Sequence, residues 1–331
     1  MRASGAAPSL RQTLLDVPRV SPGSWRQLGW LRRWLITSRA AVLPLTLCSA
    51  LFGGLLALPW TPQEGARLML VTAALVFAHA TSNLINDAVD WLRGLDRDSY
   101  FRVRYGAHPL AQGLISPAMF AVMLLATGGA AVFLGLAVCR QAGAPAYWLA
   151  GAGALLLLFY TWPLKRLGLG EIAVFLVWGP MMAGGTYWVV SGDWGAEIAA
   201  LTAIFGLGAT VVVFAKHTDK RRDDAARGIH TLPVLLGPRW APRLLALLAV
   251  AQLAAGIGWA WLTGSWAYLL LLLALPALGS LVNICLRRRP TARPKRYPLN
   301  LWPLWYTVAG FRFARATGLA LVAAAFVHGA W

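Results

Sequence analysis

Long apolar stretches alternate with short basic loops along most of the chain. The stretches recur from residue 36 to the end, and each spans about 18 to 25 residues, enough for a helix to cross the hydrocarbon core of a bilayer. Turn residues such as Pro59, Gly143 and Gly264 separate them. The pattern predicts an all-α, polytopic membrane protein with nine transmembrane helices, at residues 36–58, 66–90, 117–139, 146–163, 170–191, 197–216, 241–263, 266–286 and 313–331.

The charge distribution predicts how these helices are oriented. The formal net charge is +18, and 28 of the 30 Lys and Arg residues fall in alternate loops, which leaves only Arg67 and Arg140 in the others. Nucleic-acid binders carry such charge on a soluble face, so a nucleic-acid partner is not expected. The positive-inside rule instead places the N-terminus in the cytoplasm and the C-terminus outside. We therefore expect a multi-pass protein of the cell membrane that contacts lipid and has no obligatory protein partner.

The first 35 residues differ from the rest because they lack a continuous apolar run. Trp25, Trp30 and Trp34 stand among arginines there. This composition predicts a cytoplasmic segment, residues 1–35, with a short helix at the membrane interface. Residues 36–331 then form the membrane domain.

Seven of the twelve acidic residues lie in two short clusters, each where an apolar helix meets a basic loop. In the first cluster, the polar residues that share one helix face are Asn83, Asn86, Asp87 and Asp90. Gly94 then permits a chain reversal, which can return Asp96 and Asp98 to the same point. Buried carboxylates without partners are costly, so we expect each cluster to bind a cation at the cytoplasmic side of the membrane.

The second cluster comprises Asp219, Asp223 and Asp224, with Asp219 and Asp223 four residues apart on one helix face. Two acidic clusters that face one cavity would repel each other unless divalent cations lay between them. Mg²⁺ typically takes one or two carboxylates together with substrate phosphate oxygens. Lys165 and Lys216 lie in or beside the same cytoplasmic loops and can contact phosphate. The clusters therefore predict Mg²⁺ holding a diphosphate.

Several motifs resemble the UbiA superfamily of intramembrane prenyltransferases, most closely the branch that prenylates 1,4-dihydroxy-2-naphthoate. They are NLINDAVD at 83–90, PLAQGLIS at 109–116, YTWPLKR at 160–166 and GIHTLPVLLG at 228–237. The resemblance implies nine helices around a central cavity that opens laterally to lipid. It also implies Mg²⁺-dependent transfer of an isoprenyl group from an isoprenyl diphosphate to a lipophilic or aromatic quinone-precursor acceptor, with the active site toward the cytoplasm.

The same resemblance assigns roles to individual residues. It implies that one Mg²⁺ is held by Asp87, Asp90 and Asp96, and a second by Asp219 with Asp223 or Asp224. The residues expected to bind substrates or support the site are Asn83, Asn86, Arg104, Tyr160, Lys165, Tyr187 and Lys216. Glu171 is expected to position or deprotonate the acceptor, and the expected catalytic residues are Asp87, Asp90, Asp219, Asp223 and Glu171. His217 and His230 are interpreted as loop residues.

The chain departs from the family pattern at two positions. The second motif is usually Asp-x3-Asp with a glycine four residues after its last Asp, and Gly228 stands four residues after Asp224. That spacing places Lys220 where the first Asp belongs. Either Asp219 and Asp223 form the working pair with one residue inserted, or Asp219 and Asp224 form a looser pair. His108 likewise stands where many relatives carry an arginine.

Three alternative functions share these acidic clusters. A UbiA-like terpene cyclase, or a prenyltransferase with a non-quinone acceptor, would carry the same residues. An ion or phosphate transporter would also place charged residues in a helical bundle, but transport sites favour the bilayer midplane. The clusters here lie at the helix ends.

Overall fold

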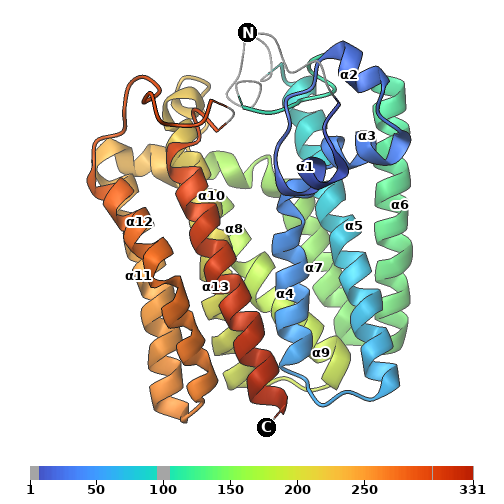
Figure 1. Cartoon of the computed structure of the whole chain (residues 1–331). Helices are drawn as coiled ribbons and strands as arrows, with labels where there is room; N and C mark the ends of the chain where they lie inside the picture. Colours follow the sequence, from blue (N-terminus) through green and yellow to red (C-terminus); the bar gives the residue numbers. More distant parts are fainter. Residues whose placement is uncertain (1–6, 95–104, 300, 331) are drawn as a thin grey trace.

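The computed structural model describes residues 7–94, 105–299 and 301–330, and these residues form helices and connecting loops without a β-strand (Figure 1). The helices of the main bundle are α4 (Pro44–Leu55), α5 (Pro62–Leu92), α6 (Pro117–Ala142), α7 (Ala144–Tyr160), α8 (Gly170–Leu176), α9 (Gly185–Ser191), α10 (Ala196–Ala225), α11 (Leu232–Thr263), α12 (Leu275–Leu286) and α13 (Trp305–Ala330). The shorter elements are α1 (Leu10–Leu15), α2 (Pro22–Arg26), α3 (Trp30–Thr37), the 3-10 helices η1 (Ala40–Val42), η3 (Leu164–Leu167) and η5 (Trp266–Ala274), and the π-helical η4 (Val177–Gly184).

Seven helical runs in the described chain are long and apolar enough to cross a membrane. They are Pro62–Leu92, Pro117–Ala142, Gly170–Ser191, Ala196–Ala225, Leu232–Thr263, Trp266–Leu286 and Trp305–Gly329. The first predicted span is a pair of helices, Trp30–Thr37 and Ala40–Leu55, bent by 61° at a short break, which makes eight if the pair counts as one. The fourth predicted span is the 17-residue α7. The multi-pass membrane protein is confirmed, and nine spans stay a prediction.

Several of the spanning helices extend beyond their predicted limits, and the extension of α10 places the second acidic cluster on a helix. Helix α5 begins at a capping box between Thr61 and Glu64, and its last turns carry Asp87 and Asp90. Helix α10 continues to Ala225. Asp219, Asp223 and Asp224 therefore lie on a continuous helix. His217 also lies on this helix, so its interpretation as a loop residue is wrong.

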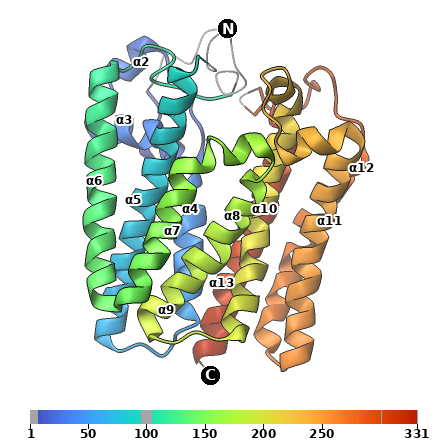
Figure 2. The ribbon, with the colours of Figure 1, turned by 180° about the vertical axis from the view of Figure 1, so that it is seen from behind.

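The helices of the second half of the chain pack closely around α10. Phe214 on α10, Leu245 on α11, Leu281 on α12 and Phe313 on α13 are fully buried in one apolar cluster. On the other side of α10, Gly206 lies against Gly179 of η4, where a Cβ on Gly206 would stand 2.7 Å from the carbonyl oxygen of Phe175. This approach brings α8 and η4 against α10, as the view from behind shows (Figure 2).

The N-terminal helices α1 to α3 cover one end of the bundle, opposite to the end where α13 finishes (Figure 1). Trp25 and Leu28 are buried among residues of the loop that precedes α6, whereas Trp30 is 65% exposed. The backbone N–H of Ala107 in that loop donates to the carbonyl oxygen of Pro18 at 3.0 Å. The N-terminal segment thus packs on the bundle, and its membrane contact stays a prediction.

Candidate active site

Asp87 forms an ion pair with Arg39 inside the protein. Arg39 occupies the break between α3 and α4 and has a left-handed backbone with φ of 60°, which is uncommon for a residue other than glycine. Its guanidinium also donates to Oδ1 of Asn86 at 3.1 Å. Because the Asp87 side chain is only 1% exposed, this pair lies in a protected environment. On the other side, Nε2 of His108 stands 3.8 Å from Oδ1 of Asp87.

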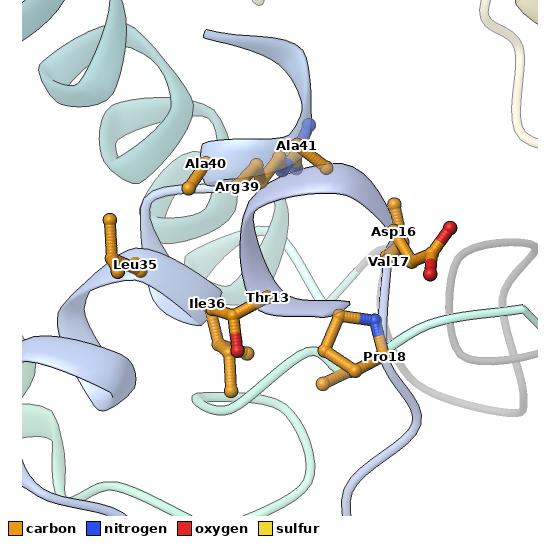
Figure 3. Close-up of a pocket in the computed structure, with 10 residues that line it drawn as sticks. Thr13, Asp16, Val17, Pro18, Leu35, Ile36, Arg39, Ala40 and Ala41 are labelled. Atoms are coloured by element: carbon orange, nitrogen blue, oxygen red, sulfur yellow. The ribbon is translucent and has the colours of Figure 1, made fainter. Parts of the chain in front are cut away.

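Arg39 was missed as a site residue from the sequence. The signal that could have found it is its position inside the first predicted span, because a charged residue at membrane depth needs a partner and often marks a functional site. Thr13 and Pro18 of the N-terminal segment lie opposite Leu35, Ile36 and Arg39 around a pocket of about 10 Å³ (Figure 3). The N-terminal helices therefore pack directly on the turn that presents Arg39.

Asn83 and Asn86 fasten α5 to its neighbours. The amide of Asn83 donates to the carbonyl oxygen of Ser38 at 2.9 Å, next to Arg39. The amide of Asn86 donates to Oγ1 of Thr161 at 2.9 Å, in the turn after α7. The structure thus gives both asparagines a positioning contact beside the first acidic cluster.

A cavity of about 240 Å³ opens next to this cluster. The polar and aromatic residues that line it are Asp90, Arg93, Thr161, Trp162, Lys165 and Arg166. Asp90 is 6% exposed, and its buried Oδ1 has no hydrogen-bond partner within the described residues. The guanidinium of Arg93 lies over the ring of Trp162 at 4.9 Å from the centroid. A carboxylate oxygen without a hydrogen-bond partner, beside the buried Lys165 and two arginines, fits a site for a metal ion and an anionic ligand.

The second cluster divides between two faces of α10. Nζ of Lys220 lies 3.3 Å from Oδ1 of Asp224, and both side chains are buried. Lys220 interacts electrostatically with Lys165, Asp224 and Asp90. Lys220 therefore lies within electrostatic range of Asp90 and Lys165, which line the cavity. No group of three or more His, Cys, Asp or Glu residues suited to a metal ion occurs among the described parts of the chain.

Asp219 points elsewhere, toward the beginning of α13. Its Oδ2 accepts hydrogen bonds from the backbone N–H and the hydroxyl of Thr307 at 2.9 and 2.7 Å, and its Oδ1 accepts from the backbone N–H of Tyr306 at 3.2 Å. Arg289 donates to the Asp219 carbonyl oxygen at 2.8 Å, and its guanidinium stands 3.6 Å from Oδ1. Asp219 thus satisfies the unpaired N–H groups that every helix start presents.

The connector before α13 is fixed at the same place. The hydroxyl of Tyr297 donates to the carbonyl oxygen of Leu304 at 2.7 Å. Burial, together with the negative charge of Asp219, raises the pKa of Tyr297 to about 12. The hydroxyl therefore stays protonated at neutral pH and keeps this donor role.

Glu171 and His217 form a second buried polar pair. Nδ1 of His217 lies 2.6 Å from Oε1 of Glu171, and each side chain is 2% exposed. Oε2 of Glu171 is buried without a hydrogen-bond partner in the described chain. Tyr160, at the end of α7, interacts electrostatically with Glu171, Asp90 and Asp224. The pair therefore belongs to the same polar region as the acidic clusters.

The structure does not bring every predicted residue together. Tyr187 lies on α9, roughly four helical turns farther along the chain than Glu171. Lys216, one turn before Lys220, and Asp223 are both half-buried on α10. Asp96 and Arg104 lie outside the described residues.

The model of the UbiA prenyltransferase family matches residues 43–304. The chain is 28% identical over 268 residues to a 1,4-dihydroxy-2-naphthoate octaprenyltransferase of Haemophilus influenzae, covering 75% of this chain and 84% of the relative. It is 27% identical over 250 residues to a 2-carboxy-1,4-naphthoquinone phytyltransferase of Synechocystis, covering 73% and 77%. Its fold is similar to that of a UbiA homologue of Archaeoglobus fulgidus solved with GPP and Mg²⁺, with a TM-score of 0.53, 16% identity, and 88% and 99% of the two chains covered.

Proposed function

Because the chain belongs to the UbiA prenyltransferase family, we propose that it transfers an isoprenyl group from a polyprenyl diphosphate to an aromatic quinone precursor within the membrane. The chain is a prenyltransferase, and the proposal concerns its donor, its acceptor and its metal ion. The observation that carries the proposal is the polar cavity, where Asp90 stands with Lys165 and Arg166 at the end of a hydrophobic bundle. The family membership and the two prenyltransferase relatives favour a transferase over the transporter alternative.

The basic residues of the cavity suit the leaving group. Transfer breaks the bond between the allylic carbon and the diphosphate oxygen, so negative charge builds on that oxygen. Lys165 is 5% exposed, and buried cations stabilise such charge more strongly than solvated ones. Arg93 and Arg166 can each donate two parallel hydrogen bonds to phosphate oxygens. These three residues would bind the diphosphate and hold the allylic carbon toward the apolar part of the bundle.

The first cluster is where a metal ion fits. The Oδ1 of Asp90 is buried and lacks a donor in the described residues, as expected of an oxygen that awaits a cation. Asp90, with Asp87 beside it, would hold Mg²⁺, and bound Mg²⁺ supplies further positive charge to the diphosphate. The A. fulgidus homologue solved with GPP and Mg²⁺ supports this choice of ion. Asp96, which lies outside the described residues, is the third ligand that the first motif would supply to this Mg²⁺.

The Glu171 and His217 pair suits the acceptor. A glutamate that accepts from Nδ1 of His217 fixes the histidine tautomer whose Nε2 can accept a proton. We propose that this pair takes the hydroxyl proton of a phenolic acceptor while its ring carbon forms the new bond to the allylic carbon. The two curated relatives that act on naphthalene acceptors support an acceptor of this class.

We further propose that the cavity faces the cytoplasm of the cell. The N-terminal helices and the start of α13 lie at one end of the bundle, and that end carries the cavity (Figure 1). In the sequence, 28 of the 30 Lys and Arg residues belong to the loops of one side. The positive-inside rule assigns such loops to the cytoplasm.

The test is a purified-protein assay with isoprenyl diphosphates of several lengths, with or without 1,4-dihydroxy-2-naphthoate, in Mg²⁺ or EDTA. We expect diphosphate release that requires both Mg²⁺ and the naphthoate and yields a prenylated product. D90N should abolish it, while D193N, the same change in an exposed turn, should not. Diphosphate release without an acceptor would indicate a cyclase. Release with non-quinone acceptors alone would show that the acceptor belongs to a different chemical class.

A further inference from the structure

The end of α10 carries a lysine and an aspartate as a buried pair, and the lysine interacts electrostatically with Asp90 and Lys165 of the cavity. Lys220 and Asp224 stand four residues apart on one helix face, with Nζ 3.3 Å from Oδ1. Lys220 is 4% exposed and Asp224 is fully buried. A buried ammonium is costly unless a carboxylate or a bound anion compensates it. The pair is therefore a built feature of the site.

Asp219 of the same cluster is engaged elsewhere, at the beginning of α13. Asp219 accepts three hydrogen bonds from the first turn of α13 and forms an ion pair with Arg289. A metal ion bound to Asp219 would have to displace these donors, and the start of α13 would lose its capping hydrogen bonds. Lys220 interacts electrostatically with Asp90 and Lys165, whereas Asp219 interacts with Arg289 and the start of α13.

A divalent cation on the α10 side does not fit this arrangement. Asp224 is the carboxylate of the cluster that pairs with Lys220, and its Oδ1 lies 3.3 Å from that ammonium group. A divalent ion bound there would stand beside a like charge at short range. On the α5 side, Asp90 offers a buried oxygen without a hydrogen-bond partner within the described parts of the chain.

We propose that Lys220, oriented by Asp224, supplies the positive charge of the α10 side to the diphosphate, so that the chain binds one divalent cation and not two. The inference rests on the proposed donor site. An ammonium is a compact point charge with three donors, which suits a phosphate oxygen but not multidentate coordination. Lys220 thus replaces both the first acidic ligand of the second motif and the metal ion that this ligand would hold.

The test counts Mn²⁺ on the full-length protein in detergent, by electron paramagnetic resonance, in the presence of inorganic pyrophosphate. We expect one Mn²⁺ per wild-type chain and loss of that ion in D90N. K220D should bind a second Mn²⁺, seen as spin coupling between the ions. R222D makes a similar charge change at an exposed position of α10 and should still bind one ion. Two ions on the wild type, or one on folded K220D, would overturn the proposal.

A second variant keeps the test decisive if K220D does not fold. K220M removes only the charge, and we expect it to keep one Mn²⁺ while its pyrophosphate affinity falls by about tenfold or more. Unchanged pyrophosphate affinity would overturn the proposal. Failure of this proposal for Lys220 can be distinguished from failure of the proposed function. An active transferase with two ions refutes only the lysine role, whereas one ion with no transfer to any acceptor refutes only the reaction.

Discussion

The guanidinium of Arg39 forms an ion pair with the carboxylate of Asp87, joining a break in the first membrane helix to the first acidic cluster. Arg39 reaches this position because its backbone is left-handed, between α3 and α4. The N-terminal helices pack on the same turn (Figure 3). A perturbation of Arg39 should therefore affect both the fold and the site.

The first prediction concerns this pair. R39M leaves Asp87 buried without its cation, so we expect the free energy of unfolding to fall by about 3 kcal/mol. The measurement is chemical unfolding in detergent micelles. Adding D87N removes the uncompensated charge, and the double variant should regain most of the stability but none of the activity. A double variant no more stable than R39M would contradict a direct interaction.

The second prediction separates Asp219 from Asp90. D219A removes the capping hydrogen bonds to Tyr306 and Thr307, and we expect it to lose about 2 kcal/mol of stability while still binding Mn²⁺. D90N should show the opposite, with loss of the ion at nearly unchanged stability. The measurements are thermal unfolding and Mn²⁺ titration on both variants. Loss of Mn²⁺ binding by folded D219A would instead identify Asp219 as a ligand of the metal ion.

The third prediction concerns the acceptor side. E171Q keeps the size of the side chain but weakens the base formed with His217, so we expect the transfer rate to fall by about a hundredfold or more. Pyrophosphate binding should not change, because Lys165 and Asp90 are intact. Rapid-quench transfer at saturating donor measures the first quantity and calorimetry the second. A fall in pyrophosphate affinity without a fall in rate would place Glu171 at the donor.

The fourth prediction concerns the contact between η4 and α10. The Cβ of G206A would lie 2.7 Å from the Phe175 carbonyl oxygen, and we expect a destabilisation of about 2 kcal/mol. Gly258 on α11 is the matched control, because a Cβ there meets nothing within 4 Å. Unfolding of G206A and G258A should therefore differ clearly. Equal stability would show that the two helices can separate at low cost.

The fifth prediction concerns orientation. Single cysteines in a cysteine-free background at Arg222 and at Ser265 lie at the two ends of the bundle. If the cavity faces the cytoplasm, an impermeant maleimide added to intact cells should label S265C and not R222C. Inverted vesicles should reverse the result. The opposite labelling would reverse the orientation inferred from the basic loops.

The sequence by itself determined the membrane-spanning character, the family and the two helices that carry the acidic clusters. Apolar periodicity and length decide whether a segment can span a bilayer, and these are local properties of the chain. The motifs around Asp87 and Asp90 are also contiguous, so their grouping on one helix face followed from spacing alone.

Only the tertiary structure decided which side chains meet. Asp219 accepts from Thr307, which is 88 residues away in the chain, and Arg39 donates to Asn86, which is 47 residues away. His217 meets Glu171 because closely packed glycines bring η4 against α10. Spacing along α10 cannot tell which carboxylate faces which neighbour. That depends on where α13 begins, because the free backbone N–H groups of its first turn need an acceptor. The long-range packing of helices therefore paired Asp219 with the start of α13 and left Asp224 to pair with Lys220.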